Sequence, residues 1–569
     1  METATIESWL KAGFEAAFPG NDFSNVTALP ATDSKFGDFQ CNNALASAKI
    51  LRLPPRAIAE QVYAKLVESQ PNFISKLELA GPGFLNITVS EEWLAEQLSK
   101  LDRDENTGIE QVGKSKKVVI DYSSPNAAKQ MHIGHIRSTV IGNAIDRLYR
   151  SIGYDVIADN HLGDWGTQFG ILIKGYRECL TQEERDNLTV ANLEKCYVLS
   201  AAKAKEDEAW KNSCREELVK LQKGDEENVA LWKAFIEISI EEFNRMYKRL
   251  GVKFDTYRGE SYYNSMMASV VDRLVESKLA EPSEGALIVK FEEEGLPIAI
   301  VRKSDGGFNY TTSDVACVES RIKDYDPAEI IYVTDDRQQL HFKQFFIICA
   351  KMGMKAKLVH VPFGLMSYGG KAISTREGNL IKLDDLLEEA VRRSKNIVLE
   401  RTPDCPNADE LAEQIGFGAV KYADLSHDPA TAIDFNWDKA LALEGNSGPY
   451  LQYAYARVCS LIEKYSQLPD AKPLSEGEFV LSSNVEKQLA LQLLQFGPSV
   501  LRAARAYKPS VLADYLFQTA QLYSSFYQRS PVLKAEAQVR DSRIRLCALF
   551  GKVLSNGLHI LGIETPERI

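Results

Sequence analysis

Short apolar runs alternate with amphipathic stretches through the middle of the chain. "KVVIDY", from residue 117, is typical of a buried strand, and "IRSTVIGNAIDRLYRSIGY" after it repeats apolar side chains at helical spacing. "DVIADN" follows as a second strand, and "EIIYVTDD", "HFKQFFIICAKMG" and "KLVHVPFG" repeat the order of strand, helix and strand. We therefore predict an α/β fold with a doubly wound parallel sheet over residues 111–438. The helical, Glu- and Lys-rich pattern near 176–254 is expected to be an insertion between the halves of that sheet.

The two ends of the chain have different patterns. Residues 1–110 combine apolar side chains at four-residue spacing, a helix entered through Pro54 and Pro55, and the turn and strand "GPGFLNITV". This combination predicts a separate N-terminal α+β domain. Residues 439–569 are helical in pattern throughout, as in "YLQYAYARVCSLIEKY", and predict a C-terminal all-α bundle.

Composition excludes several classes of protein. The 569 residues are 45% apolar and 26% charged, as in an ordinary globular protein. No segment reaches the roughly 18 continuous apolar residues of a membrane span, and the N-terminus lacks a basic targeting segment, so we expect a cytoplasmic location. The nine cysteines form no Cys-x-x-Cys pair, which argues against a zinc ribbon or a disulfide framework. A formal charge of -12 argues against binding nucleic acid by bulk attraction.

The loop "SSPNAAKQMHIGHIRS" joins the first predicted strand to the first long helix of the sheet. In open α/β sheets, ligands bind at the carboxyl ends of the strands, and a helix N-terminus favours phosphate. Gly134 lets the backbone approach a ligand, and Lys129, His132 and His135 can donate hydrogen bonds to phosphoryl oxygens. The loop therefore predicts a nucleotide site. The alternative is that such a histidine is only a helix cap or a hydrogen-bonded group of the core.

The residues of this loop also carry a resemblance to a known family. "HIGH" at 132–135 matches the signature of class I aminoacyl-tRNA synthetases, and "DYSSPNAAKQMHIGHIRSTVIGNA" with "NHLGDWGTQFG" resembles the arginyl-tRNA synthetase family in particular. "FGDFQCNNALASAK" looks like that family's N-terminal domain, and "SGPYLQYAYARV" like its anticodon-binding bundle. The resemblance implies a Rossmann-like catalytic domain, the substrates ATP, L-arginine and tRNA(Arg), and a monomer. Magnesium is expected from the ATP chemistry, with no ligand residue identified.

By this resemblance, Lys129, His132 and His135 are the catalytic residues, and His132, Gly134 and His135 bind ATP. A second ATP-binding loop of the class, with the pattern Lys-Met-Ser-Lys-Ser, is replaced here by "GGKAISTREGNLIKL". The resemblance assigns ATP binding there to Lys371, Ser374 and Arg376 and lets Lys129 supply the missing charge. Which cation does so stays open, and an ordinary surface loop is the alternative.

An arginine substrate needs carboxylates arranged to meet a planar guanidinium. By resemblance, Glu260, Tyr310 and Asp314 hold the guanidinium, and Asp121, Asn126 and Gln338 bind the α-amino end. Tyr310 and Asp314 are four residues apart, so they share one face if their segment is helical. The alternative is that each acid is an ordinary cap or surface charge.

RNA contacts of an acidic protein should use aromatic platforms with a few cations. Tyr450, Tyr453 and Arg457 are spaced for one helical face and match anticodon-contacting positions of the family. Phe36, Phe39 and Gln40 match positions that touch the D-loop. Further arginines are expected to follow the RNA backbone, namely Arg502, Arg505, Arg540, Arg543 and Arg545. The alternative is that the aromatic stripe belongs to the core.

Two other functions compete with the family assignment. One is another adenylyltransferase with the HIGH signature, or a synthetase for a different amino acid, which the acid set and the helical tail disfavour. The other is a catalytically silent tRNA-binding relative, which the intact HIGH histidines disfavour and the altered second loop leaves open.

Overall fold

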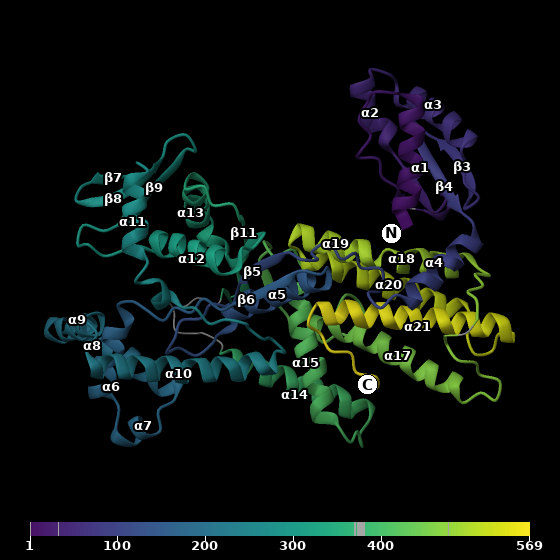
Figure 1. The fold of residues 1–569 in the computed structure, drawn as a ribbon. Helices are drawn as coiled ribbons and strands as arrows, with labels where there is room; N and C mark the ends of the chain where they lie inside the picture. Colours follow the sequence, from purple (N-terminus) through teal and green to yellow (C-terminus); the bar gives the residue numbers. More distant parts are fainter. Residues whose placement is uncertain (1, 32, 369–370, 373–381, 476) are drawn as a thin grey trace.

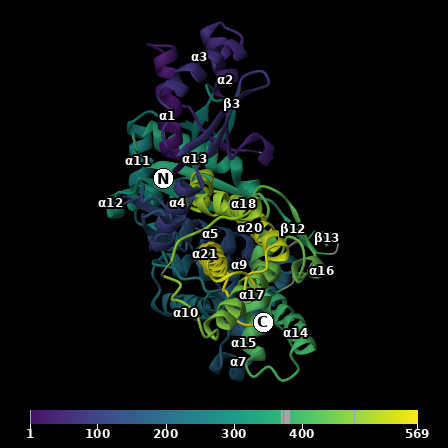
Figure 2. The same ribbon diagram turned by 90° about the vertical axis from the view of Figure 1, so that its right-hand side faces the viewer.

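The computed structural model describes residues 2–31, 33–368, 371–372, 382–475 and 477–569. The parallel sheet lies at the centre, with the N-terminal unit projecting at one end and the C-terminal helices beside it (Figures 1 and 2). Within the described residues, no helix is both long and apolar enough to cross a membrane.

The central sheet has four strands, all parallel, as the alternating pattern predicts. They are β5 (Lys117–Asp121), β6 (Asp155–Asp159), β10 (Glu329–Asp335) and β11 (Lys357–Phe363). Their order is β11-β10-β5-β6, so the chain leaves β5 first to one side and later to the other. This reversal places a crevice at the carboxyl end of β5, where ligands of doubly wound sheets bind.

Helices cover both faces of this sheet. They are α5 (Ile133–Ser151), α12 (Tyr310–Tyr325) and α13 (Gln339–Lys351). Alternate residues of β5 belong to different cores: Val118 and Ile120 pack in the cluster that contains the apolar side of α5, and Val119 packs in the cluster of α12 and α13. Two-sided burial is the reason why the three central residues of "KVVID" are all apolar. The carboxyl ends of the strands are thereby held rigidly.

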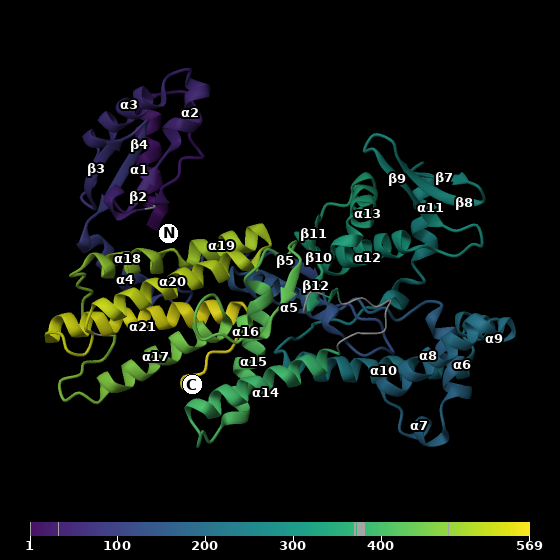
Figure 3. The same cartoon turned by 180° about the vertical axis from the view of Figure 1, so that it is seen from behind.

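The stretch expected to be an insertion is helical. Its helices are α6 (Gln168–Cys179), α7 (Gln182–Asp186), α8 (Val190–Glu206), α9 (Glu208–Gln222) and α10 (Glu226–Arg249). The long helix α10 reaches back from this group to α14 and α15 (Figure 3). There Arg245 and Arg249 form ion pairs of 2.8 Å with Asp384 at the start of α14.

A small antiparallel sheet next to the parallel one was not predicted. It contains β7 (Ala280–Ser283), β8 (Ala286–Phe291) and β9 (Leu296–Arg302), and it follows η2 (Glu260–Tyr263) and α11 (Met267–Glu276). A further sheet joins β12 (Met366–Tyr368), β13 (Lys371–Ala372) and β14 (Ile433–Phe435), and the short helix η3 (Asp336–Gln338) leads into α13.

The N-terminal unit is α+β, as predicted. Its elements are α1 (Glu2–Ala17), β1 (Leu29–Pro30), η1 (Ser34–Phe36), β2 (Phe39–Cys41), α2 (Asn43–Leu51), α3 (Pro55–Glu68), β3 (Ile74–Ala80) and β4 (Phe84–Val89). Pro54 caps α3 and Pro55 is its first residue, because proline suits a position whose N–H has no helical partner. The next helix, α4 (Glu91–Arg103), lies against the C-terminal helices (Figure 1).

The rest of the chain is helical apart from β14. Its helices are α14 (Leu383–Arg401), α15 (Ala408–Leu425), α16 (Trp437–Ala440), α17 (Gly448–Ser466), α18 (Asn484–Leu494), α19 (Phe496–Ala506), α20 (Pro509–Arg529) and α21 (Ala537–Ile560). Helix α21 packs antiparallel to α17 and α20, which buries their apolar faces and forms the predicted bundle.

Candidate active site and RNA pocket

The loop between β5 and α5 is held in an unusual conformation. Ser123, Ser124 and Ala128 have φ of 70°, 46° and 62°, a region that non-glycine residues seldom adopt. Side chains of α10 fix the loop: Tyr247 shares a 2.7 Å hydrogen bond with the Ser123 hydroxyl, and the Ser239 hydroxyl accepts from Ala128 N at 2.9 Å. Strain that is over-determined in this way is typical of a functional site.

The two histidines of the HIGH motif form one hydrogen-bonded unit at the start of α5. His132 Nδ1 accepts from Gly134 N at 3.1 Å, and His135 Nδ1 accepts from His132 N at 3.1 Å. The ring centroids are 3.9 Å apart. Because both Nδ1 atoms accept, each neutral ring carries its proton on Nε2. Both histidines therefore cap the helix, as the alternative interpretation predicted. Each still keeps an Nε2–H donor for a ligand.

The environment keeps these rings neutral near pH 7. The pKa of His132 is lowered mainly by burial and then by the charge of Lys129. The pKa of His135 is lowered to about 3, mainly by burial and then by His132 and Lys129. Lys129 is exposed, and its Nζ lies 5.1 Å from the ring centroid of Tyr197 on α8. Neutral donors with one mobile cation suit phosphate oxygens.

Gly134 is required by the histidine geometry. A Cβ at this position would lie 2.8 Å from Cε1 of the His132 ring, closer than van der Waals contact allows. Any side chain at 134 would therefore displace that ring from its capping position.

The predicted guanidinium site is a cluster of acids beside the first turn of α12. Tyr310 is 67% exposed. Asp314, one turn later, shares a 2.5 Å hydrogen bond with His341, between its Oδ2 and the ring Nε2. Burial raises the pKa of Glu260 to about 7, opposed by the charge of His161 and increased by those of Asp164 and Asp314. Burial, Glu260 and Asp314 also raise the pKa of Tyr310. These groups are close enough to repel one another, so the cluster favours a cation.

Asp121 lies at the carboxyl end of β5 but is not a free carboxylate. Its Oδ2 accepts from Arg321 Nη2 at 2.6 Å and its Oδ1 accepts from Ser124 Oγ at 3.0 Å. The same Nη2 donates to Asp159 at 2.6 Å at the end of β6. Arg321 is fully buried on α12, seven residues after Asp314, and no motif in the sequence marks it. Direct contact of Asp121 with an ammonium group therefore stays a prediction.

The other residues predicted for the α-amino end are exposed at the same sheet edge. Asn126 pairs with Gly163, just after the β6 strand, in an isolated parallel bridge. Gln338 ends η3 after β10 and caps α13. Their positions leave both side chains accessible.

The second predicted ATP loop is only partly described. Ser374 and Arg376 lie outside the described residues, and Lys371 is placed in β13 by its backbone alone. The chain after this loop meets the HIGH motif directly: Lys382 pairs with His132 in an antiparallel bridge, and Leu383 N donates to Met131 O at 3.0 Å.

One cavity of about 330 Å³ is lined by the three residues predicted to contact anticodon bases. Tyr450, Tyr453 and Arg457 share one face of α17, and the Arg457 Cζ lies 5.1 Å from the Tyr453 ring centroid. Tyr450 and Tyr453 are only partly buried, so this stripe is not simply core.

Of the three residues predicted to contact the D-loop, one lies in the core. Phe39 is 4% exposed in the core of the N-terminal unit, so its ring has no free face for a base and the prediction is wrong. Gln40 is partly exposed but donates to Asn86 at 2.8 Å, and Phe36 is partly exposed beneath Lys35.

The arginines expected to follow the RNA backbone divide into two groups. Arg502 and Arg505 are exposed. Arg540 and Arg545 are buried, and together with Arg543 they pair with acids within the protein, which makes the prediction wrong for these three. A spacing pattern could not reveal those partners, because they come from distant parts of the chain.

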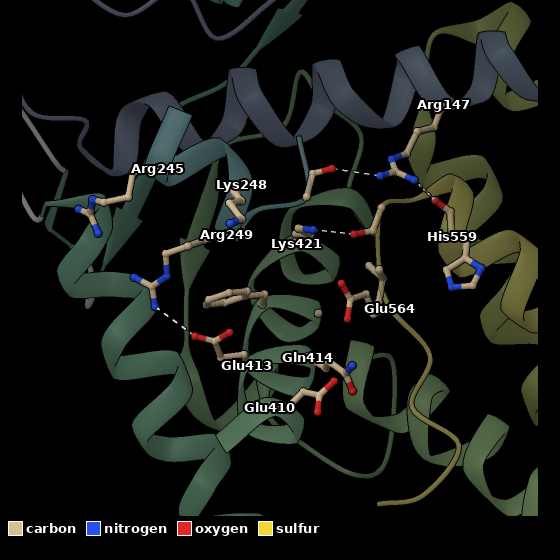
Figure 4. A pocket seen from close by; sticks show the side chains of 15 residues that line it. Arg147, Arg245, Lys248, Arg249, Glu410, Glu413, Gln414, Lys421, His559 and Glu564 are labelled. Atoms are coloured by element: carbon tan, nitrogen blue, oxygen red, sulfur yellow. Dashed lines mark hydrogen bonds and ion pairs between the residues drawn. The ribbon is translucent and has the colours of Figure 1, made fainter. Parts of the chain in front are cut away.

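A cavity of about 490 Å³ lies where α5, α10, α15 and the C-terminal tail meet (Figure 4). Arg147 of α5 donates to the carbonyl oxygens of Gly251 and His559, both at 3.1 Å. Lys421 of α15 donates to Gly562 O at 2.6 Å, and burial followed by Arg147 lowers its pKa to about 8. Arg147 therefore joins the helix that begins at the HIGH motif to the end of α21, and Lys421 joins α15 to the C-terminal tail. Neither residue was predicted from the sequence.

Comparisons with known proteins agree with this geometry. The family model described as "tRNA synthetases class I (R), catalytic domain" matches residues 97–437, more than half of the chain. The chain is 44% identical over 559 residues to the arginine–tRNA ligase of Fusobacterium nucleatum, covering 98% of this chain and 97% of that protein. The chain belongs to the arginyl-tRNA synthetase family.

Other members of the arginyl-tRNA synthetase family match over the full length. The Chromobacterium violaceum arginine–tRNA ligase is 42% identical and covers 99% of this chain and 100% of its own. The structure of Plasmodium falciparum arginyl-tRNA synthetase superposes with a TM-score of 0.86 at 28% identity, over 100% of this chain and 99% of that one. The models "Arginyl tRNA synthetase N terminal domain" and "DALR anticodon binding domain" match residues 4–89 and 451–569. The family assignment from the HIGH region is therefore confirmed, as is the fold class.

Proposed function

We propose that this chain activates L-arginine with ATP and transfers it to the terminal adenosine of tRNA(Arg). The observation that carries the proposal is the cluster of Glu260, Tyr310 and Asp314 at the same sheet edge as the HIGH histidines. Because its pKa is raised to about 7, Glu260 is only partly ionised at neutral pH, and a bound guanidinium would stabilise its charged form. A neutral or acidic amino acid side chain would gain nothing from these acids.

The first step forms arginyl-adenylate. The arginine carboxylate oxygen attacks the α-phosphorus of ATP, and the bond to the β-phosphate oxygen breaks to release pyrophosphate. Negative charge grows on the phosphoryl oxygens as this happens. The Nε2–H groups of His132 and His135 are the preorganised donors for that charge, and Lys129 adds a cation. Gly134 keeps the first ring in place.

The second step transfers arginine to RNA. A hydroxyl of the terminal adenosine attacks the carbonyl carbon of the adenylate, and AMP leaves. We propose that bases of the anticodon loop are held by Tyr450, Tyr453 and Arg457. The N-terminal domain is proposed to contact the D-loop through Phe36 and Gln40. We therefore propose that residues 1–110 contact the D-loop, residues 111–438 carry out catalysis, and residues 439–569 bind the anticodon.

Magnesium is proposed to accompany ATP. In the described part of the chain, no group of three or more His, Cys, Asp or Glu side chains is arranged to hold a metal ion. We propose that the ion is held chiefly by the ATP phosphates, because Mg²⁺ is commonly bound through substrate phosphates. We also propose a monomer in the cytoplasm, which light scattering and cell fractionation would check.

Aminoacylation with radiolabelled arginine tests the function. Wild-type protein should charge tRNA with arginine and not with lysine, whose ammonium cannot meet two acids in one plane. Asp314→Asn should raise the KM for arginine strongly and leave the KM for ATP nearly unchanged. Retention of tRNA without charging of any amino acid would favour the silent relative instead.

A further inference from the structure

The loop between β5 and α5 packs directly against the helical insertion. Ala127 and Ala128, just before Lys129, are buried in the same apolar cluster as residues of α6, α8 and α10. The Ala128 N–H also donates to the Ser239 hydroxyl of α10 at 2.9 Å. The backbone that carries Lys129 is therefore fixed by the insertion and not by the sheet alone.

The Lys129 ammonium group lies over a ring from the same insertion. Its Nζ is 5.1 Å from the ring centroid of Tyr197 on α8, within the range of a cation–π contact. Lys129 is exposed, and within the described residues no carboxylate forms an ion pair with it. Its charge nevertheless acts on both HIGH histidines, because it lowers the pKa of each. The ring therefore contacts the cation at a place from which its charge reaches the HIGH motif.

Tyr197 is itself held in place. The residue before it, Cys196, is buried, and a Cβ at Gly175 of α6 would lie only 2.6 Å from the Cys196 carbonyl oxygen. The backbones of α6 and α8 are therefore in contact at this point, and the Tyr197 ring is half-buried against the apolar cluster. A lysine side chain has many rotamers, so a fixed ring restricts where its ammonium group lies.

We propose that Tyr197 is a positioning residue for Lys129. Its ring keeps the ammonium group close to the HIGH histidines before ATP arrives, so less freedom is lost when the cation meets the phosphoryl oxygens. The helical insertion thereby takes part in the activation of the amino acid. The inference rests on the proposed function, which gives Lys129 its role.

A double-mutant cycle between Tyr197 and Lys129 tests this role in the full-length chain. The readout is kcat/KM for ATP in pyrophosphate exchange with arginine and bulk tRNA. We expect Tyr197→Leu to lower kcat/KM about two- to fivefold, the size of an exposed cation–π contact. Tyr197→Phe keeps a ring and should recover most of the loss. In the Lys129→Met background, Tyr197→Leu should cause no further fall, because the cation is absent.

Tyr176→Leu is the matched control. Tyr176 of α6 is half-buried against the same apolar cluster and packs on Phe235, with the ring centroids 5.4 Å apart. This variant loosens the insertion without removing the ring that contacts Lys129, so it should keep the wild-type kcat/KM.

Three other results would overturn the inference. They are a kcat/KM in Tyr197→Leu that equals or exceeds the wild-type value, an equal loss in Tyr176→Leu, and a further loss in the Lys129→Met background. The last would show that Tyr197 acts without the cation. If wild-type protein gives no exchange with arginine, the proposed function fails. The same cycle, measured on the Kd for ATP by calorimetry, then still decides whether Tyr197 acts through Lys129.

Discussion

Arginine affinity should depend on pH through Glu260. The free protein holds the pKa of this carboxyl at about 7, because burial and the charges of Asp164 and Asp314 outweigh that of His161. A bound guanidinium stays charged at any pH used and favours the ionised carboxylate. Binding therefore releases a proton below pH 7, and the affinity rises with pH until Glu260 is ionised.

The size of the effect follows from the ionised fraction. At pH 6 about one-tenth of Glu260 is ionised, and at pH 8 about nine-tenths, so the Kd for arginine should be up to about tenfold weaker at pH 6. His135 does not contribute in this range, because its pKa is about 3. Calorimetric titration with L-arginine, repeated in buffers of different ionisation enthalpy, measures both the Kd and the proton release.

Substitution separates Glu260 from other titrating groups. Glu260→Gln should remove the pH dependence and weaken binding at pH 8 by roughly ten- to hundredfold, the loss of a hydrogen bond to a charged group. Glu276→Gln, an exposed acid at the end of α11, is the matched control and should behave as wild type. A wild-type Kd that is the same at pH 6 and pH 8, or an unchanged pH profile in Glu260→Gln, would refute the reasoning.

Three further predictions concern the helix that begins at the HIGH motif. His135→Ala should lower adenylate formation by about 10²- to 10³-fold and leave the Kd for tRNA near wild type; near-normal pyrophosphate exchange would remove its role. Gly134→Ala should displace the His132 ring and reduce kcat for exchange at unchanged melting temperature, and a parallel fall in both would indicate misfolding instead. Asp424→Ala leaves the buried Arg137 without its 2.9 Å partner, so calorimetry should show lower stability by about 3–5 kcal/mol; an unchanged melting temperature would contradict this.

The central sheet and its order of elements could be predicted because each piece is local. "KVVID" and "DVIAD" are apolar on both faces, and Gly153 follows α5 with φ of 93°, as expected of a glycine just after a helix. The sheet β7–β9 was missed because β9 alternates weakly and leaves Ile298 52% exposed. Phe39 was misjudged because pairing of β2 with β4, not its local sequence, decides that it is buried.

The residues that face the ligands could also be predicted, but the buried ion pairs that hold their elements in place could not. The HIGH signature identified His132 and His135, and the four-residue spacing from Tyr310 pointed to Asp314. Arg137 follows the HIGH motif, yet its partner Asp424 is 287 residues away. Arg321 joins the ends of two strands in the same way. Such buried ion pairs depend on how distant segments pack, and no local pattern encodes them.

Pyrophosphate exchange into ATP, measured for each amino acid with and without bulk tRNA, decides whether this site activates arginine. We expect exchange with arginine alone among the amino acids. Exchange with a different amino acid would contradict the assignment of Glu260, Tyr310 and Asp314. No exchange under any condition, with tRNA still bound, would contradict the catalytic role of the HIGH histidines.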